Sequence, residues 1–428
     1  MRKLLVGGFI LLIAASVIAV AAARRRGWEG DRVAGWRGDI AQLVAEARRV
    51  HAGPTRPAHG PEFAVAAAEL ERRVPDLPDH RIAVELQRLL ALLGDGHSLV
   101  YATPSPRVSF GMLPIDLYLF EDGLFIVDGQ GPASPLVGSR ITRFGDLTAA
   151  ETLRRMEPYV SRDNAMAFRG FAALYLILPA FLEAWGATDD KDGATLTVDQ
   201  GEAGERTVTL AAGPARRFRK RLFAPPGAPG PVPLYLQPPE RNCVLQALPE
   251  HRAVYFQFNQ VADAPDLTLS AFASRLADAL QDRGVENLIV DLRHNNGGNN
   301  QLLAPLLEAI REFAASSPER RVYVLTSRTT FSAAQNFINR LERQVPGAIF
   351  AGEPSMSSPN FTGEDNPVTL AFSGLTVSLS NRYWQDSDPG DPRPWIEPQI
   401  KVGLTSRDWL RNEYPVLAAV FRAIATRD

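Results

Sequence analysis

Between residues 253 and 350, short apolar runs alternate with stretches of helical periodicity. The expected strands are Val254–Phe258, Leu288–Leu292, Val322–Leu325 and Ile349–Phe350, and the helices between them cover about residues 269–280, 302–313 and 333–341. Strict alternation of strand and helix is typical of βαβ units. The C-terminal half is therefore predicted to form an α/β fold with a largely parallel sheet covered by helices.

Two of these strands end in small and polar residues. Asn-Asn-Gly-Gly at 295–298 follows one strand, and Ser332 opens the helix after the next. Open α/β sheets bind ligands at the carboxyl ends of their strands. A glycine turn can point backbone N–H groups at an anion, so a serine beside it suggests a nucleophile next to an oxyanion pocket. A tight turn followed by a serine N-cap explains the same residues equally well.

Composition excludes several classes of protein. The chain of 428 residues has a net charge of −2, which gives no case for nucleic-acid binding. Its length allows two or three domains. Cys243 is the only cysteine, which excludes an intrachain disulfide and a cysteine-rich metal site. Arginine replaces lysine almost everywhere, and the only lysines are Lys3, Lys191, Lys220 and Lys401.

The N-terminus has the pattern of a membrane or export segment. A basic start precedes the uncharged run Leu4–Ala23, which is long enough to span a bilayer, and three arginines follow it. We predict an uncleaved signal-anchor over residues 1–26. A cleaved secretory signal is the alternative, since Ala21–Ala23 offers small residues for cleavage. Either case predicts that the remaining chain works outside the cytoplasmic membrane or tethered to it.

Residues 27–105 have helical periodicity and are predicted to form a helical N-terminal region. Its last helix ends at Gly94, and an extended segment begins at Leu99. His97 lies between the two, flanked by small residues that leave its ring accessible. A lone histidine in such a place is more often structural than functional.

The middle of the chain is predicted to be rich in β-strands. Residues 106–212 contain a hairpin signal at 115–127 and a second hairpin near their end. The apolar run Phe171–Trp185 is interrupted by Pro179 and is too short for a confident membrane span, so a buried helix is expected.

Two further boundaries follow from composition. Residues 213–240 are rich in proline and arginine and are predicted to be a stiff linker. The α/β domain is expected to occupy 241–428, with a hairpin around Ser373-Gly374 and a closing helix over Trp409–Ile424.

Four motifs together resemble those of a known family. Asp-Leu-Arg-His-Asn-Asn-Gly-Gly at 291–298, Thr-Phe-Ser-Ala-Ala at 330–334, Gly-Glu-Pro-Ser at 352–355 and Gly-Asp-Gly-His-Ser at 94–98 occur in family order. They are similar to those of the C-terminal-processing (tail-specific) serine peptidases and their tricorn-type relatives, over about residues 60–425. The resemblance implies a crotonase-like catalytic domain and a PDZ-like module at 106–212.

The resemblance also implies roles for individual residues. Ser332 would be the acylated nucleophile, and backbone N–H groups of Gly297, Gly298 and Ala333 would form the oxyanion hole. One branch of the family uses a lysine about 25 residues after the serine, but residues 357–360 contain none. The tricorn-type branch uses a histidine from the Gly-His region, which implies His97 as the general base.

A third group should orient the imidazole of that base. Asp391 is the first candidate, with Glu397 and Asp95 as alternatives. We expect substrate contacts from three polar residues near the two turns. They are His294, Asn295 and Asn360.

The expected function is that of a serine endopeptidase that acts on proteins or peptides and needs no metal or cofactor. The sequence leaves open whether the chain itself forms an oligomer. A catalytically silent protein that binds lipids or peptides on the same fold is the alternative, and the apolar run 171–185 would suit it. A crotonase acting on coenzyme A esters is a weaker hypothesis, because the Ser-Ala-Ala turn has no role there.

Overall fold

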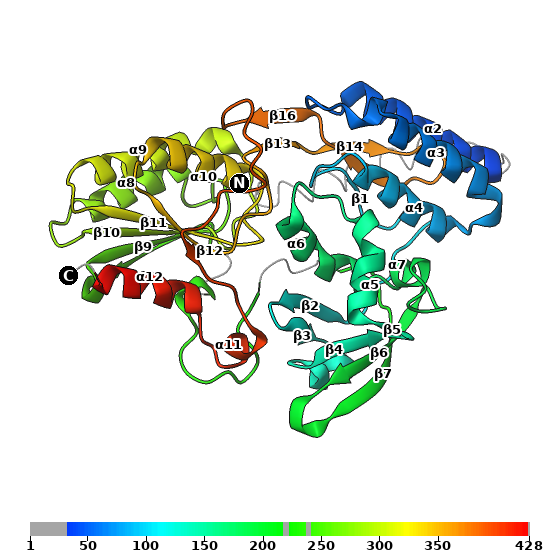
Figure 1. The fold of residues 1–428 in the computed structure, drawn as a ribbon, viewed down its shortest axis with the longest axis horizontal. Helices are drawn as coiled ribbons and strands as arrows, with labels where there is room; N and C mark the ends of the chain where they lie inside the picture. The colour runs from blue at the N-terminus through cyan, green and yellow to red at the C-terminus, as the bar shows by residue number, and fades with distance from the viewer. Residues whose placement is uncertain (1–31, 217–221, 237–240, 427–428) are drawn as a thin grey trace, which may run out of the picture.

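The computed structural model describes residues 32–216, 222–236 and 241–426. Figure 1 shows a layered α/β unit on one side, with a helical cluster and an antiparallel sheet on the other. The predicted N-terminal membrane or export segment lies outside the described residues. Within the described ranges, no helix has the length and apolar character needed to cross a bilayer.

A six-stranded sheet forms the centre of the α/β unit, in the order β17-β12-β11-β10-β9-β8. All neighbours from β9 to β17 are parallel, and only β8 is antiparallel to its neighbour. The prediction of a largely parallel sheet is confirmed. Its strands are β8 (Cys243–Leu248), β9 (Ala253–Phe258), β10 (Asn287–Asp291), β11 (Arg321–Thr326), β12 (Ile349–Gly352) and β17 (Ile400–Lys401).

Helices cover both faces of this sheet (Figure 1). In β9, Val254 and Phe256 pack toward one set of helices, whereas Tyr255 packs with Val420 on the opposite face. This alternation follows from the two-residue period of a strand. One face carries α8 (Leu269–Leu280), α9 (Ala304–Ala315) and α10 (Ala333–Gln344), and the other carries α12 (Pro415–Ala425), with the short α11 (Ser406–Leu410) before it.

The N-terminal helices share their core with strands from the C-terminal part of the chain. The predicted hairpin leaves the α/β unit and pairs with β1, with Leu99 opposite Ser378. Asp39 accepts hydrogen bonds from the N–H groups of Phe372 (2.7 Å) and Ser373 (2.8 Å). The elements are α2 (Arg32–Val50), α3 (Pro61–Arg73), α4 (Asp79–Ala91), β1 (Leu99–Val100), β13 (Asn360–Gly363), β14 (Asn366–Thr369), β15 (Thr376–Leu379) and β16 (Arg382–Gln385).

The middle of the chain forms an antiparallel sheet in the order β2-β3-β4-β6-β7. The expected hairpin at 115–127 is present as β2 and β3. The elements are β2 (Ile115–Phe120), β3 (Gly123–Gly129), β4 (Arg140–Phe144), β5 (Leu147–Thr148), β6 (Gly193–Asp199), β7 (Glu205–Ala211) and α5 (Ala149–Met156).

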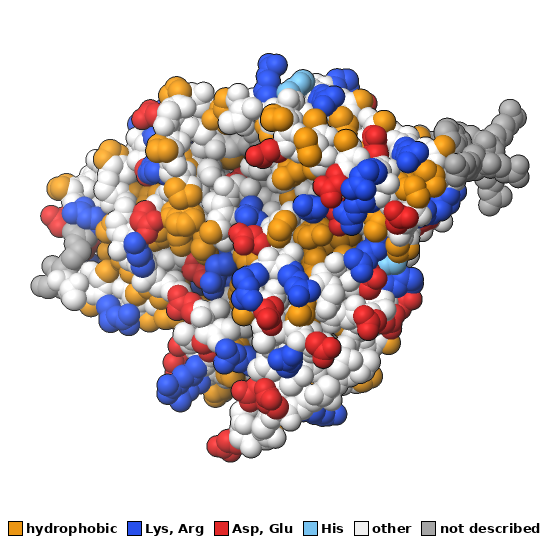
Figure 2. Space-filling view, turned by 45° about the vertical axis from the view of Figure 1, so that its right-hand side comes forward, with side chains coloured by type: hydrophobic (Ala, Val, Ile, Leu, Met, Phe, Trp, Pro, Cys, Tyr) orange, Lys and Arg blue, Asp and Glu red, His pale blue; other side chains and the backbone are white. Residues whose placement is uncertain are grey.

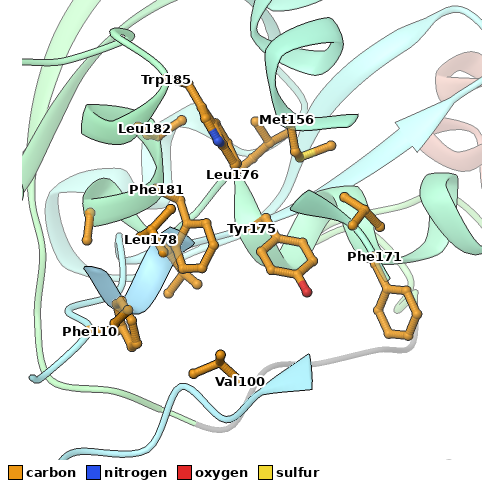
Figure 3. Packing of buried hydrophobic residues seen from close by; sticks show 14 of the residues in the cluster. Val100, Phe110, Met156, Phe171, Tyr175, Leu176, Leu178, Phe181, Leu182 and Trp185 are labelled. Carbon is orange, nitrogen blue, oxygen red and sulfur yellow. The ribbon is translucent and has the colours of Figure 1, made fainter. Parts of the chain in front are cut away.

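The apolar run 171–185 is buried, as expected, but belongs to two helices. They are α6 (Ala165–Tyr175) and α7 (Pro179–Ala184). Proline lacks an N–H and is tolerated only in the first turn of a helix, so α7 begins at Pro179. Figure 3 shows Tyr175, Phe181 and Trp185 packed together, with Phe181 and Trp185 ring centroids 5.8 Å apart. These side chains are at most 6% exposed, so the run is core.

Candidate active site

Ser332 occupies a strained position between β11 and α10. Its φ of 58° and ψ of −123° are sparsely populated for a residue with a Cβ, and such a conformation costs on the order of 1–3 kcal/mol. Phe331 and Ala333 on either side are buried, whereas Ser332 is partly exposed. The sharp turn between strand and helix thus presents the Ser332 side chain to the surface.

The glycine turn after β10 lies directly against Ser332. A Cβ on Gly297 (φ 98°) would be 2.7 Å from the Ser332 Cβ and 3.0 Å from the Ala333 nitrogen. A Cβ on Gly298 (φ 139°) would be 2.1 Å from the carbonyl oxygen of Val261. Only glycine allows both the backbone angles and these approaches. The structure therefore brings together the two turns that the sequence singled out.

The three predicted oxyanion-hole donors differ in their hydrogen bonds. The N–H of Gly297 donates to Asn295 Oδ1 at 2.9 Å. Across the described chain, no hydrogen bond within the protein engages the N–H of Gly298 or of Ala333. Gly297 is therefore occupied as a donor, which runs against its predicted role, while Gly298 and Ala333 keep their N–H groups for a ligand.

Asn295 has a structural role, and its predicted substrate contact stays a prediction. Its side chain is buried, with 0% of the residue exposed. Its side chain accepts from Gly297, and its backbone carbonyl oxygen accepts a hydrogen bond from the Phe331 N–H at 3.1 Å. Asn295 thus ties the glycine turn to the residue that precedes Ser332.

A buried ion pair rigidifies the segment before the glycine turn, and the sequence did not single it out. Arg293 Nη2 lies 2.5 Å from Asp291 Oδ2, and the Tyr255 hydroxyl donates to the same oxygen at 2.7 Å. Burial by itself would raise the pKa of Asp291, but the Arg293 charge and the hydrogen bonds from Arg293 and Tyr255 together outweigh it, so this pKa lies below its usual value. Both residues are almost completely buried, so the pair fixes the backbone where β10 ends.

The structure places His97 beside the residue that precedes the serine. Its ring stacks on Phe331, with centroids 4.3 Å apart and planes inclined by 23°. It also stacks on Phe361 of β13, with centroids 5.9 Å apart and nearly parallel planes inclined by 11°. The predicted base thus packs on the residue before the predicted nucleophile, although the two come from distant parts of the sequence. The role of His97 as a base stays a prediction.

Asp95, an alternative orienter of His97, anchors the backbone of this loop. Its Oδ1 accepts from the N–H of His97 at 2.8 Å and from the Ser380 hydroxyl at 2.6 Å. Its Oδ2 lies 3.0 Å from His51 Nε2. Burial favours a raised pKa for Asp95, but the hydrogen bonds from His51, Ser380 and Ser98 and the attraction of His51 together outweigh it and lower the pKa. The carboxylate therefore fixes the backbone position of His97.

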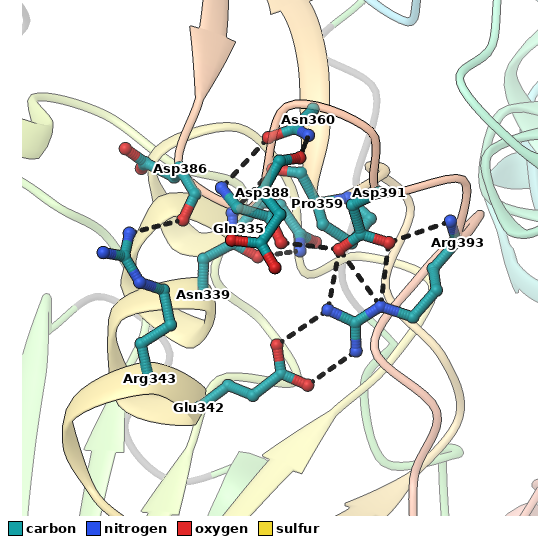
Figure 4. A network of polar contacts seen from close by, with 11 residues as sticks. Gln335, Asn339, Glu342, Arg343, Pro359, Asn360, Asp386, Asp388, Asp391 and Arg393 are labelled. Carbon is teal, nitrogen blue, oxygen red and sulfur yellow. Dashed lines mark hydrogen bonds and ion pairs between the residues drawn. The ribbon is translucent and has the colours of Figure 1, made fainter.

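The first-choice orienter, Asp391, belongs to a network at the end of α10 (Figure 4). It accepts from the Ser387 hydroxyl at 2.5 Å and from Arg393 Nε at 3.0 Å. Arg393 also pairs with Glu342 at 2.7 Å. The hydrogen bond from Arg393 lowers the pKa of Asp391. Asn360, predicted to touch substrate, accepts from the Ser387 N–H at 3.0 Å and thereby joins this loop to β13. These contacts are structural, and orientation of His97 by Asp391 stays a prediction.

Two other predicted residues have partners outside the serine turn. Glu397 accepts from Trp395 Nε1 at 2.5 Å and pairs with Lys401 at 2.5 Å on the surface. The imidazole of His294 stacks on Tyr235, with centroids 5.0 Å apart, and the residue is 8% exposed. His294 also lines a partly open pocket between the carboxyl ends of β10 to β12 and β2. A local or substrate-side role for His294 is compatible with this position.

Ser357 is a site residue that the sequence did not single out. It entered the argument only as the position where one branch of the family has a lysine. It is buried, and its hydroxyl oxygen accepts a hydrogen bond from the Ser332 N–H at 3.4 Å. Its spacing from Ser332 was the only sequence signal that could have identified it. In the described ranges, no cluster of three or more His, Cys, Asp and Glu residues could hold a metal ion.

The fold matches that of a solved protein, CPAF. The lactacystin complex of mature CPAF has a TM-score of 0.63 and 14% identity, with 92% of this chain and 99% of that chain covered. A serine-to-alanine variant of CPAF gives 0.64 and 13%, and mature CPAF alone gives 0.59 and 14%, each covering 92% of this chain and 97% of the other. No protein-family model and no curated protein sequence matches the chain. The molecule therefore shares its fold with CPAF over nearly its whole described length.

Proposed function

We propose that this protein is a serine endopeptidase with Ser332 as its nucleophile. The observation that carries the proposal is the strained turn that holds Ser332 against a glycine turn with open N–H groups. Strain of this kind persists where the surrounding structure imposes it and is concentrated at functional sites. The shared fold adds support, because CPAF is a serine peptidase.

Each step of the reaction has a residue assigned to it. Ser332 Oγ attacks the scissile carbonyl while His97 accepts its proton. The N–H groups of Gly298 and Ala333 donate to the tetrahedral oxyanion, and one such donor contributes about 10²–10³ in rate. His97 then protonates the leaving amine, and water hydrolyses the acyl-enzyme by the same route in reverse.

The described lysines support histidine over lysine as the base. Lys191 pairs with Asp192 in the antiparallel module, and its side chain is 50% exposed. Lys401 pairs with Glu397 and is 71% exposed. Ser357 lies 25 residues after Ser332, where one branch of the family has its dyad lysine. The proposal therefore assigns the proton transfer to His97, with no metal or cofactor.

The middle sheet is proposed to be PDZ-like in architecture but not to bind peptide tails at β2. Carbonyl groups on the open edge of this strand are already hydrogen-bonded. Arg216 donates to Ile115 O at 2.5 Å, and both Arg169 and Arg328 donate to Leu119 O. An added peptide strand would have to displace these arginines. We expect cleavage rates to be unchanged when the C-terminal residues of a substrate are replaced.

A fluorophosphonate probe tests the proposed function. It should label the wild-type protein and fail to label Ser332→Ala, which should also lose hydrolysis of an unfolded protein substrate. An absence of labelling in folded wild type would favour the silent binding protein instead. That alternative has lost its main support, because the apolar run 171–185 is core.

The place of action is proposed to be outside the cytoplasmic membrane. The uncharged run 4–23 with basic residues on both sides supports this. Extraction of membranes with alkaline carbonate should leave the full-length chain in the membrane. Recovery of a shortened chain in the soluble fraction would favour the cleaved signal.

The face drawn in Figure 2 has interspersed acidic and basic side chains, which suits protein substrates rather than nucleic acid.

A further inference from the structure

Asp163 extends from the middle module to the loop that carries His97. It lies just before α6, and its Oδ1 accepts a hydrogen bond from the Gly96 N–H at 3.0 Å. Its Oδ2 is buried and has no hydrogen-bond partner among the described residues. A buried carboxyl oxygen without a partner is costly as part of an anion, and less so as part of a neutral acid.

The same carboxyl group faces the hydroxyl behind the proposed nucleophile. The Ser357 hydroxyl is close enough to affect the pKa of Asp163, and its oxygen accepts the N–H of Ser332. Asp163 is therefore in contact with both halves of the site. One contact is with the loop of the proposed base, and the other leads through Ser357 to Ser332.

The neighbouring Asn164 fixes this position. Its Nδ2 donates to Ser355 O at 3.2 Å and to Pro394 O at 2.7 Å. Its Oδ1 caps α6 by accepting from the Met166 N–H at 2.9 Å. The start of α6 is thus docked onto the 355–357 loop, so Asp163 cannot turn away without breaking these bonds.

The charges around Asp163 favour its neutral form. Burial and the Asp95 carboxylate raise its pKa to about 8, against smaller lowering effects of the Gly96 N–H and the Ser357 hydroxyl. Of the other titratable groups, His51 is bonded to Asp95, and His97 is stacked on Phe331. The adjacent Arg162 pairs with Glu157 at 3.0 Å.

We propose that Asp163 is a positioning residue of the peptidase site. As a neutral carboxylic acid, it keeps the His97 loop and Ser357 at fixed positions relative to each other. The carboxyl group accepts from the Gly96 N–H through Oδ1 and contacts the Ser357 hydroxyl, which lowers its pKa slightly. Ionisation places a second negative charge beside Asp95, and their repulsion loosens the loop. This inference rests on the proposed function.

The pH dependence follows from the sign of the shift. A carboxyl whose pKa is raised on folding holds a proton that the unfolded chain has lost, so stability falls as pH rises from about 4 to 8. Activity should fall over the upper part of this range and above it. Asp163→Asn keeps a neutral side chain of the same shape and should remove both dependences.

The main experiment is the pH profile of kcat/KM with a fluorogenic peptide. Wild type should show an alkaline decline centred near pH 8, and Asp163→Asn should remain active without that decline. Ser357→Ala should move the decline to higher pH, because it removes a group that lowers the pKa of Asp163. Asp189→Asn, an exposed aspartate in the same module, is the matched control and should behave as wild type. An unchanged alkaline decline in Asp163→Asn would overturn the proposal.

A spectroscopic measurement separates this inference from the proposed function. The infrared band of a protonated carboxylic acid should titrate near pH 8 in the wild type and be missing in Asp163→Asn. It requires no activity, so it also tests Asp163 in Ser332→Ala. Absence of a titrating band overturns the role of Asp163, whereas failure of fluorophosphonate labelling overturns the peptidase.

Discussion

The Ser332 turn and the His97 loop reach the same site by different means. The Ser332 turn depends mainly on two adjacent strands, because the Asn295 carbonyl binds the Phe331 N–H and Gly297 packs on the serine. The His97 loop instead depends on segments spread through the chain. Its partners are His51, Asp163, Phe361 and Ser380.

This difference predicts different sensitivities. The turn is defined by backbone geometry, so steric changes should damage it most. The loop is held by buried polar groups, and loss of one partner leaves another unsatisfied at a cost of about 1–3 kcal/mol or more. Mutations at the loop should therefore lower stability and activity together, whereas mutations at the turn should lower mainly activity.

The largest effect should come from His97→Ala. Loss of the proposed base should lower kcat by roughly 10³-fold or more, and loss of ring stacking should cost about 1 kcal/mol of stability. Steady-state hydrolysis and thermal unfolding measure the two. His59→Ala removes an exposed imidazole and is the control. Near-wild-type kcat in His97→Ala would exclude it as the base.

Gly297→Ala should have the next largest effect, confined mainly to the turn. The alanine Cβ would lie 2.7 Å from that of Ser332, and the alanine would have to adopt the positive φ of 98° found at this position. We expect kcat to fall about 10²-fold, as for loss of one oxyanion donor, and stability to fall by about 1–3 kcal/mol. Gly38→Ala, where nothing lies within 4 Å, should have no loss of activity. Retained activity in Gly297→Ala would show that the turn tolerates displacement.

Asp95→Asn should show the sensitivity of the loop. It leaves His51 without its buried carboxylate, and the loss of a buried hydrogen-bond partner costs about 1–3 kcal/mol. Because the pKa of Asp95 is lowered on folding, its contribution is present above about pH 4 and is lost as pH falls further. Wild type should lose stability on acidification, and Asp95→Asn should lose less. Equal acid dependence in denaturant titrations of the two proteins would contradict this.

Asp391→Asn should have the smallest effect. The carboxylate is held by Arg393 and Ser387, so kcat should stay within about threefold of wild type, as for a side chain remote from the transition state. Arg393→Gln should match it, since it breaks the same network. A fall of about 10⁴-fold in Asp391→Asn alone, the size of effect expected of an orienting aspartate, would restore Asp391 as the orienter.

Much of the α/β unit was predictable from local patterns. Alternating apolar runs and helical periods predicted β9 to β12 and the helices between them. The apolar run 171–185 was correctly predicted to be buried, but its division into α6 and α7 was missed, although Pro179 indicated a break. The hairpin of β14 and β15 was predicted, but not its pairing with β1.

The sequence by itself determined the parallel sheet, the glycine turn and the exposed serine, because strand and helix periods and glycine geometry are local properties. Only the tertiary structure decided that Asn295 occupies the N–H of Gly297 and that Ser357 supports Ser332. It also decided that Asp163 reaches the His97 loop. A buried polar group can find its partner anywhere along the chain, so its hydrogen bonds follow from topology, which no local period encodes.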